Sequence, residues 1–331
     1  MNIATDIPGF VSAGGLDVYV EQLGQGPDVL LIGGLGDTVE SWEFQLKGLA
    51  DRYRLTAFDN GGAGRTAMPD GPVTVSTMAD DAAGVLDALG IASAHVAGFS
   101  GGSIVAQELA VRRPDLVRSL VLQSTWPVPD VYFRRWLRFV QWLVAAVPDE
   151  RTFLEYFFLD IYTARAHDDG TVAGFVDDVL AFPHKQAPED LQRYLDAFIA
   201  DGRADRPARI TAPTLVLAGG VDAAAGTELG RAVAAAVPGA VRGVGDRGPP
   251  AVPGGARPLE RPGGRLLARG RGAVRDADPP GGQRPPVARP PTGGGPPQVR
   301  AQPTRAPSQA SRSPVTSSRL VSLKTSCRAS G

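Results

Sequence analysis

Short apolar runs bounded by turn residues alternate with longer helical patterns along most of this chain. Five such runs occupy residues 28–32, 53–58, 95–97, 120–122 and 214–217. Continuous apolar runs of this length are typical of strands buried on both faces of a parallel sheet, which need helical crossovers between them. Between Met78 and Leu89 the apolar residues return at helical spacing, and Gly90 is a typical stop signal. The pattern predicts an α/β protein with a mostly parallel, doubly wound sheet.

Strand-like runs disappear between about residues 126 and 207, where helical patterns dense in aromatic residues take their place. An all-helical insertion in an α/β chain indicates a cap. The aromatic residues are Tyr132, Phe133, Trp136, Phe139, Trp142, Phe153, Tyr156, Phe157, Phe158 and Tyr162. They either form the cap's own core or face the sheet, and those that face the sheet would give an apolar pocket of modest size.

The composition changes abruptly near residue 241. About half of residues 241–331 are Gly, Pro or Arg, and this stretch contains no Phe, Trp, Tyr or His. It cannot bury a core, so we expect a disordered tail over residues 246–331. The formal net charge of −1 is therefore an average over an acidic first part and a basic tail, and it indicates no partner.

The single cysteine, Cys327, lies in this tail, so one chain can form neither a disulfide framework nor a cysteine metal site. The N-terminus has no signal-peptide pattern, and no apolar stretch approaches membrane-spanning length. We expect a cytoplasmic protein that does not associate with membranes.

A serine lies at a strand-to-helix junction in residues 98–102, Gly-Phe-Ser-Gly-Gly. The apolar run before it predicts a strand, and the helical pattern after it continues to Pro114. A serine on so sharp a turn is a nucleophile elbow, in which the flanking glycines leave room for the strand and helix to pack closely. The alternative is an ordinary glycine turn.

Three segments together resemble the α/β-hydrolase fold family over roughly residues 16–244. Residues 98–102 match its G-x-S-x-G, residues 33–36 (Gly-Gly-Leu-Gly) are similar to its oxyanion loop, and residues 59–65 are similar to its D-x-R-G-x-G turn. Gly33 and Gly61 replace a histidine and an arginine of those patterns, which predicts more flexible loops. The resemblance implies core segments over residues 1–125 and 208–245, with a helical cap over 126–207.

The resemblance also implies roles for particular residues. Ser100 would be the nucleophile, and Leu35 and Gly101 would form the oxyanion hole with their backbone N–H groups. Gly34, beside Leu35 in the loop over residues 33–36, would also belong to the oxyanion hole. Asp222, in the loop after residues 214–217, would orient the catalytic base. The alternatives are that residues 33–36 form only a strand-ending turn and that Asp222 caps a helix.

The histidine expected as the base is missing. The family has a Gly-His pair after the last strand, whereas Asp246 occupies that position here. Aspartate is a weaker base and would face Asp222 with like charge, so it is a poor substitute. We expect His95 to be a satisfied core histidine, and His167 and His184 to be surface residues of the cap.

Two hypotheses account for the tail. Gly, Pro, Arg and Ala have codons built from G and C alone, so a shift of reading frame near residues 241–247 in GC-rich DNA would produce such a sequence and remove the Gly-His pair. A genuine cationic extension that contacts nucleic acid or anionic lipid is the other hypothesis, but it lacks aromatic residues for stacking on bases.

The sequence therefore predicts a serine hydrolase that acts on a small apolar ester or lactone through an acyl-enzyme and is impaired by the loss of its histidine. The resemblance extends to the enol-lactonase and cofactor-free haloperoxidase-like branch of the family. No metal, cofactor or nucleic acid is expected, and the oligomeric state stays open. The alternative is a non-catalytic protein of the same fold that binds a small apolar ligand.

Overall fold

The structure, a computed structural model, describes residues 7–219 and 225–245. All of them belong to one unit, residues 1–274. Two predicted site residues, Asp222 and Asp246, lie outside the described residues, as does the predicted tail over residues 246–331.

The described residues form one mixed sheet of eight strands in the order β1-β2-β4-β3-β5-β6-β7-β8. The strands are β1 (Ile7–Ala13), β2 (Leu16–Leu23), β3 (Asp28–Ile32), β4 (Arg54–Phe58), β5 (Ala94–Phe99), β6 (Val117–Gln123), β7 (Thr214–Gly219) and β8 (Val241–Gly245). Strands β3 to β8 pair in parallel, which confirms the predicted architecture. Among these strands, β2 forms the antiparallel pairs: with β1 at one edge of the described sheet and with β4 on its other side.

The antiparallel hairpin at that edge is not among the strands predicted from apolar runs. Its strand β2 alternates between buried and more exposed residues instead of running continuously apolar, because one of its faces is less covered. The turn between β1 and β2 uses Gly14 and Gly15, both with positive φ, which glycine adopts without strain.

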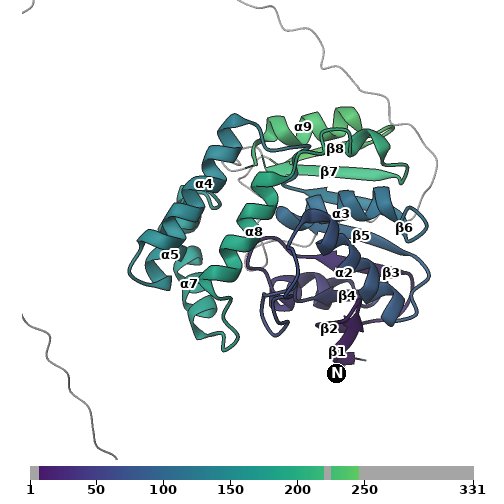
Figure 1. Ribbon diagram of the computed structural model, residues 1–331, viewed down its shortest axis with the longest axis horizontal. Coiled ribbons are helices and arrows are strands. Elements are labelled where there is room, and N and C mark those ends of the chain that lie inside the picture. Colours follow the sequence, from purple (N-terminus) through teal and green to yellow (C-terminus); the bar gives the residue numbers. More distant parts are fainter. Residues whose placement is uncertain (1–6, 220–224, 246–331) are drawn as a thin grey trace, which may run out of the picture. The chain divides into compact units, whose positions relative to one another are not determined.

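Helices cover both faces of the sheet (Figure 1). The elements outside the sheet are η1 (Val39–Trp42), α1 (Glu43–Leu49), α2 (Val75–Ala88), α3 (Gly101–Arg112), α4 (Val131–Ala146), α5 (Glu150–Phe157), α6 (Ala164–Asp168), α7 (Thr171–Ala181), α8 (Pro188–Ala200), η2 (Pro207–Arg209) and α9 (Gly226–Ala236). Leu30 and Ile32 of β3 join the core cluster that contains α2 and α3, whereas Val29 and Leu31 join the cluster that contains α1. Because successive residues of β3 are buried on opposite faces, its whole run is apolar.

The helix predicted over residues 78–89 is α2, which begins three residues earlier. The side chain of Thr74 accepts a hydrogen bond from the backbone N–H of Thr77, and the Thr77 hydroxyl accepts one from the backbone N–H of Thr74. This capping box satisfies two backbone donors and fixes the start of the helix. Gly90 follows with φ of 67°, as its predicted role as a stop signal requires.

Five helices, α4 to α8, lie between β6 and β7 in the chain, where the sequence predicts a helical insertion. We call them the helical cap. In Figure 1, α4, α5 and α7 lie to one side of the sheet, and α8 runs between them and the core. A buried ion network joins the end of the cap to α3. In it, Arg206 pairs with Glu108 at 2.8 Å and with Asp201 at 2.6 Å, and both Arg206 and Glu108 are fully buried.

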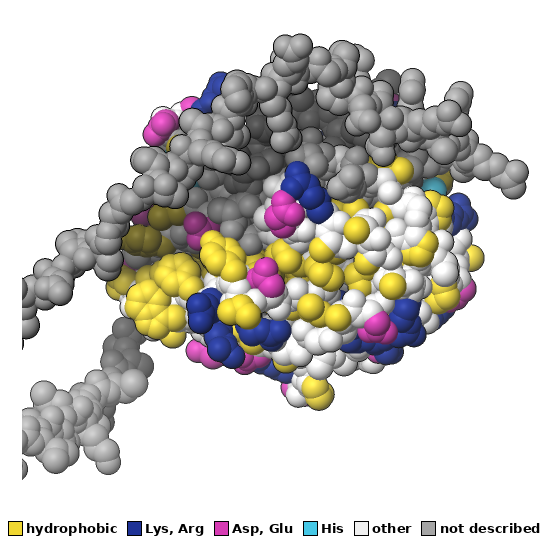
Figure 2. Space-filling view, turned by 90° about the horizontal axis from the view of Figure 1, so that it is seen from above, with side chains coloured by type: hydrophobic (Ala, Val, Ile, Leu, Met, Phe, Trp, Pro, Cys, Tyr) yellow, Lys and Arg dark blue, Asp and Glu magenta, His cyan; other side chains and the backbone are white. Residues whose placement is uncertain are grey.

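Part of the cap's aromatic surface faces outward. Tyr132, Phe139 and Trp142 of α4 are exposed, and so is Tyr156 of α5. On the face drawn in Figure 2, a hydrophobic cluster lies toward one end, and basic and acidic side chains are interspersed elsewhere. Within the described ranges, no helix combines the length and apolar character that crossing a bilayer requires.

Candidate active site

Ser100 occupies the sharp turn between β5 and α3. Its φ of 51° and ψ of −123° place it in a strained region that non-glycine residues rarely adopt. A Cβ atom at Gly98 would overlap the carbonyl oxygen of Gly102, and a Cβ atom at Gly102 would overlap the carbonyl oxygen of Ile32. The turn therefore requires glycine at both positions, as the G-x-S-x-G pattern predicts.

Hydrogen bonds hold this turn at the carboxyl end of the sheet. The backbone N–H of Ser100 donates to the carbonyl oxygen of Gln123 in β6 at 2.9 Å. The carbonyl oxygen of Ser100 accepts from the hydroxyl of Ser103 at 2.6 Å. The Ser100 side chain lines a cavity between the sheet and the helical cap.

The loop after β3 packs directly against the turn. A Cβ atom at Gly34 would lie 3.0 Å from the Cβ of Ser100, and one at Gly33 would lie 2.7 Å from the Cβ of Asp37. The carbonyl oxygen of Gly33 accepts from the side-chain amide of Asn60 at 3.1 Å. Glycine at position 33, where the family pattern has histidine, thus makes room for Asp37, and the loop is fixed by contacts instead of being loosened.

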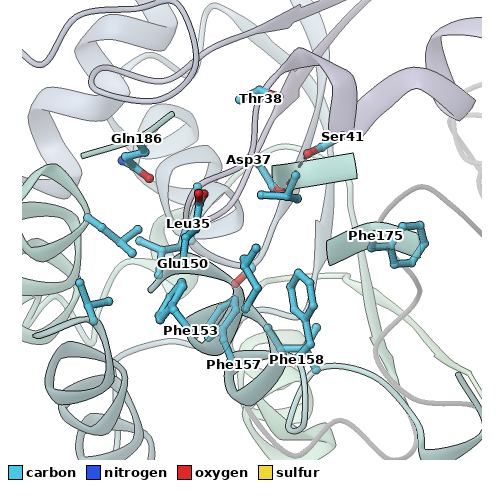
Figure 3. A pocket seen from close by; sticks show the side chains of 18 of the residues that line it. Leu35, Asp37, Thr38, Ser41, Glu150, Phe153, Phe157, Phe158, Phe175 and Gln186 are labelled. Atoms are coloured by element: carbon cyan, nitrogen blue, oxygen red, sulfur yellow. Dashed lines mark hydrogen bonds between the residues drawn. The ribbon is translucent and has the colours of Figure 1, made fainter. Parts of the chain in front are cut away.

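Asp37 holds the loop that contains the predicted oxyanion-hole residues Gly34 and Leu35. Its carboxylate accepts from the backbone N–H of Gly34 at 2.7 Å and from the hydroxyl of Ser41 at 3.1 Å (Figure 3). The backbone N–H of Gly34 thus has an intramolecular acceptor, and a part for Gly34 in the oxyanion hole stays a prediction. Leu35 and Gly101 stay as the candidate donors, and both line the cavity beside Ser100.

The electrostatic setting of Asp37 is unusual for a carboxylate. Burial raises the pKa of Asp37, although the hydrogen bonds from Gly34 and Ser41 act in the opposite direction. Tyr162 of the cap also lines the cavity, and burial raises its pKa, with the charge of Asp37 as a further cause. Sequence reasoning missed Asp37, although a carboxylate three residues after a loop glycine is a common way to hold such a loop.

The turn over residues 59–65 is also held firmly. Asp59 is buried and accepts from the backbone N–H of Val39 at 2.8 Å and from that of Arg65 at 2.9 Å. A Cβ atom at Gly64 would overlap the carboxylate of Asp59, and Gly64 has φ of 57°. The expected flexibility at Gly61 is limited as well, since Pro69 lies 3.0 Å from a Cβ atom built there.

The cavity has a volume of about 1070 Å³, which is at the upper end for small-molecule sites and larger than the predicted modest pocket. Of the ten cap aromatics singled out in the sequence, six line it: Phe133, Trp136, Phe153, Phe157, Phe158 and Tyr162. In Figure 3, Phe153, Phe157 and Phe158 lie together on one side, across from Thr38 and Ser41. The prediction that some aromatics form an apolar pocket wall is confirmed.

The cavity is less apolar than predicted. Among the described residues, six acidic residues line it, compared with one lysine, Lys185. The acidic residues are Asp37, Glu40, Glu43, Asp149, Glu150 and Asp178. Gln186 also lines the cavity, and neither the oxygen nor the nitrogen of its buried amide has a hydrogen-bond partner within the described part of the chain. No local sequence pattern marks these residues, because they come from loops and helix ends far apart in the chain.

The three histidines lie in different settings. The Nδ1 of His95 lies 2.8 Å from the hydroxyl of Ser119, and burial lowers its pKa, so His95 is the satisfied histidine predicted. The Nε2 of His167 lies 3.2 Å from the carbonyl oxygen of Phe158. His184 is exposed, as predicted, but it also lines the cavity and packs against Phe182. Over the described residues, no group of His, Cys, Asp and Glu side chains is suited to hold a metal ion.

The two remaining predicted site residues border on described strands. Asp222 lies three residues after the end of β7 at Gly219, and Asp246 directly follows the end of β8 at Gly245. Both strands end at the same edge of the sheet as β5, because β5, β6, β7 and β8 are parallel neighbours.

Known proteins resemble this chain in both sequence and structure. Residues 27–160 match the family model described as alpha/beta hydrolase fold. A protein of Azorhizobium caulinodans named "Putative carbamate hydrolase RutD" is 32% identical over 231 residues, which cover 69% of this chain and 86% of that protein. A hydrolase from Pseudomonas aeruginosa PA01 is 25% identical with a TM-score of 0.66, over 72% of this chain and 90% of the other. The enol-lactonase from Burkholderia xenovorans LB400, at 24% identity, a TM-score of 0.63 and coverage of 72% and 92%, shares the fold.

Proposed function

We propose that this chain, which belongs to the alpha/beta hydrolase fold family, is built to hydrolyse carboxylic esters or lactones through an acyl-enzyme formed on Ser100. The strained conformation of Ser100 is the observation that carries the proposal, since it points the hydroxyl out of the turn between β5 and α3. Glycines 98 and 102 make that turn possible. Such strain persists where function requires a particular side-chain position.

In the first step, the oxygen of Ser100 bonds to the carbonyl carbon of the substrate while its proton passes to a base. The carbonyl oxygen becomes an oxyanion, which the backbone N–H groups of Leu35 and Gly101 would stabilise. One such donor contributes about 3 to 4 kcal/mol to the transition state in a serine protease. When the intermediate collapses, the alcohol leaves with the proton and the acyl group stays on Ser100.

In the second step, water attacks the acyl carbon and loses a proton to the base. The bond between the acyl carbon and the Ser100 oxygen then breaks, the base returns the proton to that oxygen, and the carboxylic acid leaves. Asp222 would orient this base, and the position that the family assigns to histidine holds Asp246. Loss of the histidine from a serine triad lowers turnover about 10⁶-fold, and a residual acceleration of about 10³-fold over water comes from the oxyanion hole and binding. We infer that this chain turns over very slowly.

The relatives' names widen the substrate class. A carbamate presents a carbonyl carbon to the same nucleophile, so the proposed chemistry accommodates carbamates as well as esters and lactones. The missing histidine specifically favours a second candidate function, which is non-catalytic binding of a small ligand in the 1070 Å³ cavity. The aromatic wall of α4 and α5 would serve such a ligand equally well.

Labelling with a serine-directed fluorophosphonate separates the two functions. For the hydrolase we expect slow stoichiometric labelling of Ser100 and measurable turnover of a p-nitrophenyl ester, both abolished by Ser100→Ala. The matched control is Ser12→Ala in β1, at the far edge of the sheet from β5, which keeps both signals. Ligand binding without labelling, or labelling that survives Ser100→Ala, contradicts the proposal.

A further inference from the structure

A second serine shares the conformation of Ser100. Among the described residues, Ser100 and Ser124 are the only non-glycine residues with positive φ, and both have φ of 51°. Glycine would adopt this conformation without strain, so a serine held there indicates a use for its hydroxyl.

The two serines lie at neighbouring positions of the sheet edge. Phe99 is paired with Gln123 in the parallel register of β5 and β6, and Ser100 and Ser124 are the residues that follow. The backbone N–H of Ser100 donates to Gln123, and that of Ser124 donates to the carbonyl oxygen of Leu217 at 3.0 Å. Both serines line the same cavity.

The side chains of Ser124 and Trp126 each carry a buried polar group that forms no hydrogen bond with the described residues. Ser124 is 4% exposed and Trp126 is 2% exposed, and neither the Ser124 hydroxyl nor the Trp126 indole N–H has a hydrogen-bond partner among the described residues. Both residues line the cavity. Nearly all buried polar groups in proteins are hydrogen-bonded, so two unpartnered groups two residues apart beside a cavity point to a ligand.

The chemistry of these groups limits what the ligand presents. An indole N–H only donates, and a serine hydroxyl donates to any acceptor that its rotation reaches, so the matching ligand atom is a hydrogen-bond acceptor. The excess of carboxylates in the cavity lining disfavours an anionic acceptor. A neutral ether or carbonyl oxygen fits both conditions.

We propose that Ser124 and Trp126 form a subsite that binds a neutral oxygen on the acyl group of the substrate, close to the scissile carbonyl. The proposal rests on the proposed function, because it takes Ser100 as the point of attack. It narrows the substrate class to esters or lactones whose acyl part carries an ether or carbonyl oxygen. Ser124 and Trp126 are then specificity-determining residues.

Binding of two matched, hydrolysis-resistant amides tests the subsite without requiring turnover. N-butyl-2-methoxyacetamide and N-butylbutanamide differ only in an oxygen that replaces a methylene group. By isothermal titration calorimetry on the full chain, we expect the methoxy compound to bind about fivefold more tightly. Ser124→Gly and Trp126→Phe should each reduce this ratio to about twofold or less, whereas Ser100→Ala keeps it.

The variants are chosen so that loss of folding does not imitate the result. Glycine tolerates the φ of Ser124, so the melting temperature of Ser124→Gly should not fall. Phenylalanine keeps the ring contacts of Trp126 with Phe133 and Phe198. Equal binding of the two amides, no binding of either, or a ratio that survives Ser124→Gly overturns the subsite. Fluorophosphonate labelling of Ser100 reports separately on the proposed function.

Discussion

The two walls of the cavity position their functional groups in different ways. The core wall, formed by the ends of β3, β5 and β6, presents backbone N–H groups and two serines in strained turns. The cap wall, formed by α4, α5 and α7, presents aromatic rings and carboxylates on the faces of helices. Close backbone packing leaves the core wall little freedom, whereas the cap wall depends on which side chains its helices turn inward. The core wall therefore holds the proposed nucleophile and the proposed oxygen subsite, and the cap wall supplies most of the aromatic surface.

The largest effect on stability is expected where the two walls join. Arg206→Leu leaves the buried carboxylates of Asp201 and Glu108 without their central partner, which should lower the free energy of unfolding by about 3 to 5 kcal/mol. Chemical denaturation measures the change. Arg209→Leu is the matched control, because its pair with Asp205 is about half exposed on both sides and should contribute less than about 1 kcal/mol. Similar losses in the free energy of unfolding for both variants would show that attachment of the cap to α3 does not depend on the buried ion network.

Replacing glycine with alanine should change the free energy of unfolding in opposite directions on the two walls. Gly102→Ala drives a Cβ atom into the carbonyl oxygens of Ile32 and Gly33, and should lower the free energy of unfolding by about 3 kcal/mol. Gly174→Ala places a methyl group in open space on the exposed face of α7, and should raise it by about 0.5 to 1 kcal/mol. Thermal and chemical denaturation of both variants test the contrast, which fails if Gly102→Ala is tolerated.

A smaller effect is expected from pH. Burial raises the pKa of Asp81 in α2 to about 6, with the charge of Asp80 as a further cause. Burial also raises the pKa of Tyr194 in the cap helix α8, with the charge of Asp81 as a further cause. The folded state binds this proton more tightly than the unfolded state, so stability should fall as pH rises from about 4 to about 6.

Asp81→Asn should remove up to about 2 kcal/mol of that fall, measured by denaturation across the pH range. Asp51→Asn serves as the control, because its side chain is 76% exposed, and it should keep the wild-type dependence on pH. If the stability of Asp81→Asn depends on pH as that of the wild type does, Asp81 is not the group whose titration changes stability in this range.

The difference between the walls also explains which features of the fold and the site can be predicted from the sequence and which cannot. The parallel strands and the elbow at residues 98–102 follow from local patterns, because continuous apolar runs and paired glycines have few other uses. The hairpin β1–β2 was missed because its pattern is weaker. Asp37 was missed although its partners, Gly34 and Ser41, lie within four residues of it in the chain. Ser124, Trp126 and Gln186 belong to the cavity only through tertiary packing, so no local pattern marks them.

The charge of the cavity lining affects the end of the proposed reaction. Hydrolysis turns a neutral ester into a carboxylic acid that loses its proton at neutral pH. The described part of the lining contains six acidic residues and one lysine, so it would repel this product after the bond is broken. The same charge that admits a neutral substrate without penalty would thus hasten departure of the acid and keep inhibition by accumulated product weak.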